Sequence, residues 1–475
     1  MHLNKRLTTY SATLLLTVAL GCQPTLMAND LTSNSFETNF IDYNNQNVES
    51  ILLPRNLFVL SPIYSSLNNA NIFYKNSILS SNINSYITGY SDYGTVNDIG
   101  WSLNNSTYIN AANVFDVTLT MNNTLFPSSK SVNVELIDTK NTNPIRLLPI
   151  GDSLTRAGAY LNHIKDVLPN ITILGTRFYS NDGMPAREGR GGWTLDKYFT
   201  SINSSELDSP FIFPENISGS HYKGNTRDWK NICYYDSTHH AYAGFQKIAR
   251  GWRDNGPFLY DLNGYYKYPL KGDVMVDPSY KYGSLWIEWD GSSWEPISPP
   301  TSYEFSFSKY MDRFSPAFKD GSPTHVSILL GANDFGYGNA TENIDIYISQ
   351  INKMITSIKS YDKDIKIIIC TPTLGPDTSV VTDSELEFYK KYDKKIKQGV
   401  YYLLQTYDTT TCEDAGIYIA PMHLTLDVSN GFNYSSAIED NSPVIKAANG
   451  IHPNNEYGHI QMGNTLAGVL QKYRD

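Results

Sequence analysis

The sequence predicts an α/β fold with a doubly wound parallel sheet over residues 143–475. In that region short apolar runs alternate with longer segments of helical periodicity. The first run, residues 145–150, stops abruptly at a Gly-Asp-Ser-Leu turn, which is typical of a strand followed by a helix. With 475 residues, 41% of them hydrophobic, the chain can form a sizeable core and more than one domain.

The remaining elements follow the same alternation. Residues 155–168 are predicted as the first helix, since Tyr160, Leu161 and Ile164 recur at helical spacing. The later predicted strands are residues 171–174, 326–330, 365–370 and 416–420, and the later predicted helices are residues 343–360, 383–406 and 454–473.

A long insertion is predicted at about residues 200–325. The stretch from Thr194 to His325 is far longer than a connection between a strand and a helix needs. It contains most of the tryptophans, which form either the small core of a subdomain or an exposed platform for stacking sugars. These are Trp229, Trp252, Trp286, Trp289 and Trp294.

The N-terminal third is predicted to be a separate unit. Residues 29–142 read as a small β-sandwich-like domain, because apolar runs at residues 57–60, 114–119 and 132–136 are separated by Asn, Ser and Gly turns. Such a domain could bind a glycan, a cell surface or the rest of the chain.

Residues 1–28 are predicted to be a signal peptide. Lys5 and Arg6 precede an apolar stretch, and small residues follow it up to Ala28. Cleavage after Ala28 would give a secreted protein, extracellular or periplasmic. Cleavage before Cys22 would instead leave a lipid-anchored lipoprotein at the cell surface. No later segment reads as a transmembrane span.

Charge limits the classes of partner. The net charge is −10 and no basic run occurs, which argues against nucleic acid as a partner and against docking on an anionic membrane. Charged residues make up only 18% of the chain, below the usual quarter. A polar, weakly charged surface suits an uncharged partner such as a glycan.

Ser153 is the best candidate for a nucleophile. Residues 148–155 read Leu-Pro-Ile-Gly-Asp-Ser-Leu-Thr, so this serine lies at the carboxyl end of the first predicted strand. Ligands of open α/β sheets collect at such ends. The alternative is an ordinary turn serine that caps a helix.

Three further blocks accompany it. Gly-Gly-Trp-Thr occupies residues 191–194, Gly-Ala-Asn-Asp occupies residues 331–334, and Gly-Ile-His-Pro occupies residues 450–453. In order and type the four blocks resemble the SGNH (GDSL) hydrolase family of esterases and lipases, over about residues 143–475. The resemblance implies that family's three-layer, flavodoxin-like fold, a serine nucleophile, and no metal or cofactor.

The resemblance also assigns roles. It implies that Ser153 is the nucleophile and His452 the general base, with the Ser153 amide, the Gly192 amide and the Asn333 side chain as the oxyanion hole. A serine hydroxyl is a weak nucleophile that needs an imidazole to take its proton, and a developing oxyanion needs preorganised donors. Singly, each residue has an ordinary alternative, such as a turn glycine, a capping asparagine or a surface histidine.

Asn449 departs from the family pattern. The base histidine is usually preceded three positions earlier by an aspartate that orients it, and here that position is asparagine. An asparagine carbonyl can fix the imidazole tautomer but brings no charge. The site therefore uses Asn449 as its third member, works as a Ser-His dyad, or recruits a carboxylate such as Asp440 or Glu439.

Two weaker metal patterns are set aside. Cys233, His239 and His240 lack a fourth zinc ligand, and residues 261–264 resemble a calcium loop without its later ligands.

Together these features predict a secreted serine esterase that hydrolyses ester groups, most often O-acetyl groups, on a polysaccharide. One alternative is a lipid or lysophospholipid esterase, which predicts an apolar groove beside Ser153. Another is a glycan-binding surface or phage-tail-associated protein with a weakened hydrolase site. Asn449 and a short resemblance of residues 271–294 to a hairpin module of phage tail proteins favour the last.

Overall fold

The computed structural model describes the greater part of the chain from residue 58 onward. The described ranges are residues 58–66, 69–79, 87–103, 114–121, 128–176, 185–201, 209–215, 235–236, 241–242, 259–260, 266–267, 274–276, 286–298, 302–314, 318, 320–377, 383–439, 442–448 and 450–475. The predicted signal peptide, including Cys22, lies outside them, as does Asn449.

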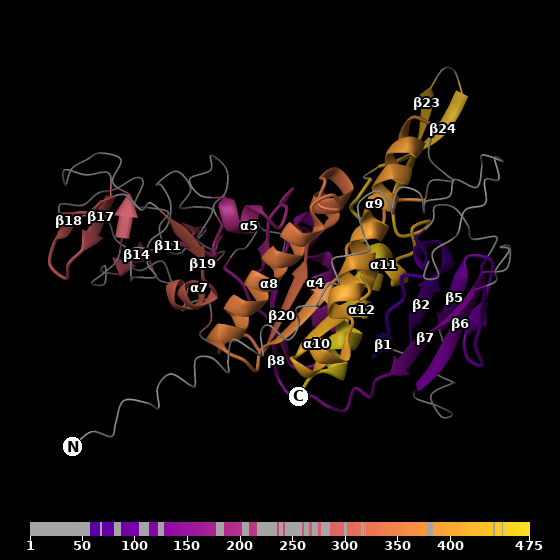
Figure 1. Ribbon diagram of the computed structural model, residues 1–475, viewed down its shortest axis with the longest axis horizontal. Coiled ribbons are helices and arrows are strands. Elements are labelled where there is room, and N and C mark those ends of the chain that lie inside the picture. Colours follow the sequence, from indigo (N-terminus) through magenta and orange to yellow (C-terminus); the bar gives the residue numbers. More distant parts are fainter. Residues whose placement is uncertain are drawn as a thin grey trace.

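A six-stranded parallel sheet lies at the centre of the described chain (Figure 1). The strands β8 (Ile145–Gly151), β20 (His325–Leu329), β21 (Lys366–Cys370) and β22 (Ile417–Ala420) lie side by side in that order. The strands β9 (Ile171–Ile173) and β10 (Glu188–Gly189) pair in parallel with the other side of β8. The predicted α/β fold with a parallel sheet is confirmed.

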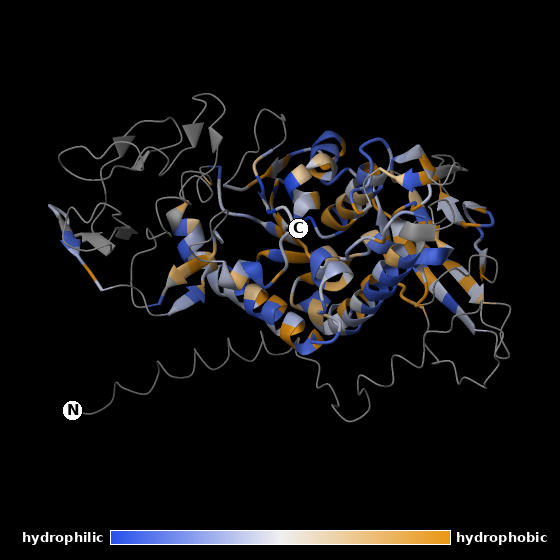
Figure 2. Cartoon of the chain, turned by 90° about the horizontal axis from the view of Figure 1, so that it is seen from above, coloured by the Kyte–Doolittle hydropathy of each residue, from blue (hydrophilic) through white to orange (hydrophobic). Residues whose placement is uncertain are grey.

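Helices cover both faces of this sheet. In β21, Ile367 and Ile369 belong to the core shared with α8 (Ile344–Tyr361) and α9 (Asp383–Tyr407). Ile368 and Cys370 belong to a second core with α4 (Ala159–Val167) and α12 (Gly458–Lys472). The strand is apolar on both faces because both faces are buried. Figure 2 shows helices that carry hydrophobic colour along one side and hydrophilic colour along the other.

Residues 63–136 form two smaller sheets beside α12. One contains β1 (Ile63–Ser65), β7 (Ser128–Leu136), β6 (Val114–Met121) and β3 (Ile87–Tyr90), and the other contains β2 (Ala70–Phe73), β5 (Gly100–Leu103) and β4 (Thr95–Val96). Alternate residues of β6, from Phe115 to Met121, point into the core with Trp101 of β5. Of the apolar run at 57–60, the described residues 58–60 do not form a strand, since Phe58 makes only a single bridge to Ile78.

The small sheets pack directly on the parallel-sheet region. At Gly468 of α12, an added Cβ would lie 1.8 Å from the carbonyl oxygen of Tyr64 in β1. Only glycine allows the helix and the strand to approach so closely. Polar contacts join the same regions, since the Asn76 amide donates to the carbonyls of His423 and Leu426 at 2.9 and 2.8 Å.

The insertion contributes short antiparallel strands. The pairs are β11 (Ile212–Pro214) with β19 (Tyr303–Phe305), β12 (Tyr235–Asp236) with β13 (Ala241–Tyr242), and β14 (Leu259–Tyr260) with β15 (Tyr266–Lys267), while β16 (Val274–Val276), β17 (Trp286–Trp289) and β18 (Trp294–Pro296) form a three-stranded sheet. Its last element, α7 (Phe307–Arg313), returns the chain to the parallel sheet, and Phe307 and Tyr310 are fully buried.

Several elements differ from the sequence prediction. The first helix is broken into α3 (Ser153–Ala157) and α4, because Gly158 between them has a φ of 77°. The last helix begins at Gly458 rather than 454, because the Asn454 side chain accepts the amides of Tyr457 and Gly458. The structure also contains α5 (Lys197–Thr200), α10 (Thr410–Asp414), α11 (Met422–Thr425) and a hairpin of β23 (Tyr434–Glu439) and β24 (Ser442–Ala447), which the pattern did not predict.

Among the described residues, no helix combines the length and apolar character required to cross a lipid bilayer.

Candidate active site

Ser153 lies where β8 ends and α3 begins. The preceding Asp152 caps the helix, because its carboxylate accepts the Leu154 amide at 2.9 Å. Its own amide donates to the carbonyl of Leu329 at the end of β20. Since β8 and β20 are neighbours, the first helix residue is fixed at the carboxyl edge of the sheet, where the strand order reverses.

His452 approaches Ser153 from the other end of the chain. Its Nε2 lies 2.7 Å from Ser153 Oγ, although 299 positions separate the two residues. Both side chains are partly exposed. The sequence blocks around Ser153 and His452 therefore meet in space, within the distance over which a proton can pass between oxygen and nitrogen.

The environment of His452 favours the neutral imidazole. Burial, and secondarily the positive charge of Arg156, lower the pKa of His452 below its usual value. A neutral ring can accept a proton at Nε2 when the other ring nitrogen carries its own. The geometry therefore places an unprotonated base beside the serine hydroxyl.

Gly192 lies in a loop attached to the end of β8. Next to β10, the Arg190 amide donates to the Gly151 carbonyl at 2.9 Å, two positions before Ser153. Gly192 has a φ of 69°, and an added Cβ would meet no atom within 4 Å. Glycine is thus required by the backbone conformation rather than by packing, and the residue is exposed.

Asn333 follows β20 in a short π-helix, η6 (Ala332–Tyr337). This rare form occurs frequently at functional sites. The Asn333 Nδ2 donates to the Trp193 carbonyl at 3.0 Å, which ties the side chain to the residue after Gly192. An amide nitrogen carries two hydrogens, so the second is available to a further acceptor.

Asp334 also connects η6 to the loop that contains Gly192. Its Oδ1 accepts the Leu195 amide at 2.7 Å, while its Oδ2 is buried and has no hydrogen-bond partner among the residues that the structure describes. Burial raises the pKa of Asp334 to about 7, and it does the same for Asp152, whose pKa is raised further by the charge of Asp334. Burial therefore disfavours the ionised forms of Asp152 and Asp334.

A buried polar cluster supports the glycine loop, and sequence reasoning did not identify it. Glu188 accepts the Thr176 hydroxyl and the Tyr310 hydroxyl on one oxygen and pairs with Arg190 at 2.8 Å on the other. The Tyr198 hydroxyl lies 2.8 Å from the Gly151 carbonyl oxygen and 2.7 Å from the Glu188 carbonyl oxygen, so the two acceptors share its single hydrogen. The residues come from four separate segments, so only a contact pattern across the fold could have revealed them.

The proposed third member of the site is not placed. Asn449 and Asp440 lie outside the described residues. In the hairpin, Tyr434 pairs with Ala447 at the base and Glu439 with Ser442 at the tip, and Figure 1 shows it projecting beyond α9. At about 3.3 Å per residue, the backbone of Glu439 lies about 16 Å from the hairpin base that leads to His452.

The two weaker metal patterns of the sequence both lie in the insertion. Cys233, His239, His240 and residues 261–264 all lie outside the described chain. Within the part that the structure describes, no three His, Cys, Asp or Glu side chains are grouped so that they could hold a metal ion.

Comparison with models of protein families finds a match that covers all four sequence blocks of the site. The model of the GDSL-like lipase/acylhydrolase family matches residues 147–466, which is more than half of the chain and includes the blocks around Ser153, Gly192, Asn333 and His452. The chain belongs to this family. As a GDSL-like acylhydrolase it is a serine ester hydrolase, as the sequence resemblance predicted.

Solved structures give more distant likenesses to this GDSL-like chain. They include a family 3 carbohydrate esterase from Clostridium thermocellum (11% identity, TM-score 0.32, covering 70% of this chain and 98% of that one). An acetyl esterase mutant crystallised with acetate has 12% identity and a TM-score of 0.31, covering 70% and 99%. A possible lipase from Chitinophaga pinensis has 13% identity and a TM-score of 0.32, covering 69% and 98%. A search of curated proteins finds no match.

The buried Asp334 makes a pH-dependent prediction. Its folded pKa of about 7 exceeds the unfolded value of 3.8, so between these pH values the folded state retains a proton that the unfolded state has released. That binding stabilises the fold at low pH, and the stabilisation declines as pH rises towards 7. Asp334→Asn removes the effect, so the melting temperature of the variant minus that of the wild type should rise by several degrees between pH 4 and 7.

Scanning calorimetry or fluorescence at a series of pH values measures this difference. Asp345→Asn, at an exposed position in the first turn of α8, is the matched control. A difference that stays constant with pH for Asp334→Asn would contradict the role of burial.

Proposed function

We propose that the protein is an exported serine esterase that removes O-acetyl groups from a polysaccharide. The observation that carries the proposal is the 2.7 Å contact between Ser153 Oγ and His452 Nε2, beside the Gly192 loop and Asn333. The family match supports ester hydrolysis in general, and the features of the surface described below support the choice of substrate.

The proposed reaction proceeds through an acyl-enzyme. Ser153 Oγ attacks the ester carbonyl carbon while His452 Nε2 takes the hydroxyl proton. The Ser153 and Gly192 amides and the second hydrogen of Asn333 Nδ2 stabilise the oxyanion. His452 returns the proton to the sugar oxygen as its bond to the acyl carbon breaks. Water, deprotonated by His452, then attacks the acetyl-Ser153 ester, which releases acetate and restores the hydroxyl.

A groove lined by both polar and apolar side chains supports a glycan as the substrate. It has a volume of about 440 Å³ and lies between the β2–β5 sheet and the start of α12. Glu456 and Tyr457 line it, four and five positions after His452, and both are exposed. An exposed aromatic ring beside a carboxylate suits a sugar, which offers an apolar face for stacking and hydroxyl groups for hydrogen bonds.

The amides of the groove are oriented for donation. The side-chain oxygen Oδ1 of Asn97 accepts the backbone amides of Ile99 and Gly100, and the side-chain oxygen Oε1 of Gln461 accepts the Asp427 amide at 2.8 Å. The Asn464 carbonyl contacts His163 Nε2 at 2.7 Å. Because these contacts engage the carbonyl oxygens, the NH2 groups remain to donate to sugar oxygens.

The rest of the proposal comes from the sequence. Residues 1–28 direct export, with either release of the mature protein or a lipid anchor at Cys22, and residues 29–142 form a β-sandwich-like domain ahead of the hydrolase domain. The insertion at about 200–325 offers a second sugar platform through Trp286, Trp289 and Trp294.

Removal of the nucleophile or the base tests the mechanism. Ser153→Ala and His452→Ala should each lower kcat/KM for p-nitrophenyl acetate by about 10³-fold or more, while the melting temperature changes little, since both side chains are partly exposed. Comparing p-nitrophenyl acetate with the octanoate separates an acetyl esterase from a lipid esterase, which would favour the longer chain. A Ser153→Ala protein with wild-type activity would show that the mechanism is wrong.

Tyr457 tests the choice of substrate. Tyr457→Ala should lower kcat/KM for acetate release from acetylated xylan by about 5- to 10-fold and leave p-nitrophenyl acetate hydrolysis unchanged, because a small ester does not use remote binding energy. Tyr90→Ala removes another exposed tyrosine ring, from β3, and serves as the control. If Tyr457→Ala has no effect and Trp286→Ala, Trp289→Ala or Trp294→Ala lowers kcat/KM for acetylated xylan, the sugar-binding surface lies on the insertion instead.

Asn449 tests the third position of the site. If its carbonyl accepts the imidazole N–H of His452, Asn449→Asp should add charge stabilisation of the imidazolium and raise kcat/KM about tenfold, equivalent to about 1.4 kcal/mol. An unchanged rate for this variant, combined with loss of activity in Asp440→Ala or Glu439→Ala, would move the third position to the preceding hairpin.

A further inference from the structure

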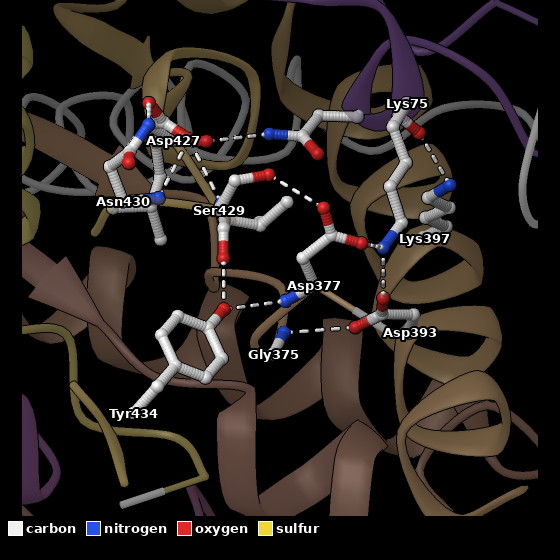
Figure 3. A network of polar contacts seen from close by, with 12 residues as sticks. Lys75, Gly375, Asp377, Asp393, Lys397, Asp427, Ser429, Asn430 and Tyr434 are labelled. Carbon is white, nitrogen blue, oxygen red and sulfur yellow. Dashed lines mark hydrogen bonds and ion pairs between the residues drawn. The ribbon is translucent and has the colours of Figure 1, made fainter. Parts of the chain in front are cut away.

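A buried ionic cluster lies between the N-terminal sheets and the loops that carry the proposed base. Lys75 belongs to η1 (Tyr74–Asn76), directly after β2, and its ammonium group lies 3.5 Å from Asp377 and 3.9 Å from Asp393 (Figure 3). The Lys75 and Asp393 side chains are only 6% and 4% exposed. Among the described residues the Lys75 ammonium has no hydrogen-bond partner, so its contacts with these two carboxylates are ionic.

The surroundings explain why a cation is needed there. Burial raises the pKa of Asp393, and the charges of Lys75 and Lys397 oppose that rise. Lys397 lies in the same cluster, where its Nζ donates to the Lys75 backbone carbonyl at 2.6 Å and burial lowers its pKa to about 7. Lys75 is therefore the cation that the N-terminal region contributes to the buried Asp393 and the partly exposed Asp377 of the hydrolase region.

One route of contacts leads from this cluster through Asp393. Asp393 Oδ1 accepts the Gly375 amide at 2.8 Å, in the loop after β21. Gly375 lies near the loop of the base, since a Cβ added to it would be 3.5 Å from the Gly450 carbonyl oxygen. Gly450 precedes His452 by two positions, so this route ends at the backbone that orients the imidazole.

A second route leads through Asp377. Its Oδ2 accepts the Ser429 hydroxyl at 2.6 Å, and its amide donates to the Tyr434 hydroxyl, which in turn donates to the Val428 carbonyl (Figure 3). This segment supports the base loop, because the Asn454 side chain donates to the Asn430 and Phe432 carbonyls at 2.8 and 3.1 Å. Asn454 follows His452 by two positions, so the cluster reaches both sides of the base.

We propose that Lys75 is a positioning residue for His452, and that the N-terminal sheets are thereby part of the hydrolase machinery rather than an independent module. The ammonium group holds Asp377 and Asp393, these carboxylates hold the loops after β21 and β22, and those loops hold residues 450–454. The inference rests on the proposed roles of Ser153 and His452.

Lys75→Met tests the proposal, because it keeps the length of the side chain and removes the charge. We expect kcat for p-nitrophenyl acetate to fall about 10- to 100-fold with KM within twofold of the wild type, since misplacement of a catalytic group by about 1 Å has an effect of this size. The rate at which a fluorophosphonate probe labels Ser153 should fall by a similar factor.

Lys472→Met is the matched control. Lys472 of α12 pairs with Glu135 of β7 at 2.7 Å, so it joins the same two regions through a closer but more exposed ion pair at a different place. Its removal should leave kcat and labelling within twofold of the wild type. Equal loss of activity in both variants would mean that losing any ion pair between the N-terminal region and the hydrolase region lowers activity. That result would overturn the specific role of Lys75.

Asp393→Asn keeps the proposal testable if Lys75→Met does not fold. The amide retains an oxygen that can accept from Gly375 but loses the attraction to Lys75, so kcat should fall about 3- to 10-fold with KM unchanged. Wild-type kcat and labelling in this variant, or in a folded Lys75→Met, would refute the inference. If the wild-type protein neither hydrolyses esters nor is labelled at Ser153, the proposed function fails instead.

Discussion

The structure depends on one constraint, the parallel pairing of β8 with β20. Because parallel strands end at the same edge, this pairing places the turn that contains Ser153 beside the turn that contains Asn333. The Asp152 amide bonds the end of β20 directly, and β10 adds the glycine loop on the other side of β8. Three of the four sequence blocks are thus brought together by strand neighbours. Only His452 arrives by a longer path, through the loop before α12.

The buried polar side chains next to the site hold the backbone of the surrounding loops in place and take no part in the reaction. Glu188, Arg190 and Asp334 are buried and bond to loop amides, hydroxyls or one another. Burial of charge is expensive unless partners are present, so such groups are retained where an irregular backbone must have a single conformation. The loops around Ser153 lack the repeating hydrogen bonds of a helix or sheet, and these side chains replace them.

The sequence predicted the parts of the molecule that depend on local pattern. Strands such as residues 365–370 and helices such as 343–360 are apolar runs or amphipathic periods, and the structure has them within a few residues. The contact between Ser153 and His452 was expected from block order and family resemblance rather than from periodicity. The break at Gly158, the two-residue β10 and the Lys75 cluster depend on contacts distant in sequence, such as Arg187 against Gly158, and no local pattern contains them.

The packing of β1 on α12 has a consequence for how the chain acquires its structure. Tyr64 and Gly468 are in contact although nearly the whole hydrolase region separates them in sequence, and Asn76 bonds to His423 and Leu426 over a similar interval. During synthesis, the N-terminal sheets emerge first, but the surface on which they pack is made last. Contacts of such long sequence separation form slowly, because the intervening chain must first be ordered. The nascent chain therefore exposes the apolar residues of β1 until α12 has left the ribosome.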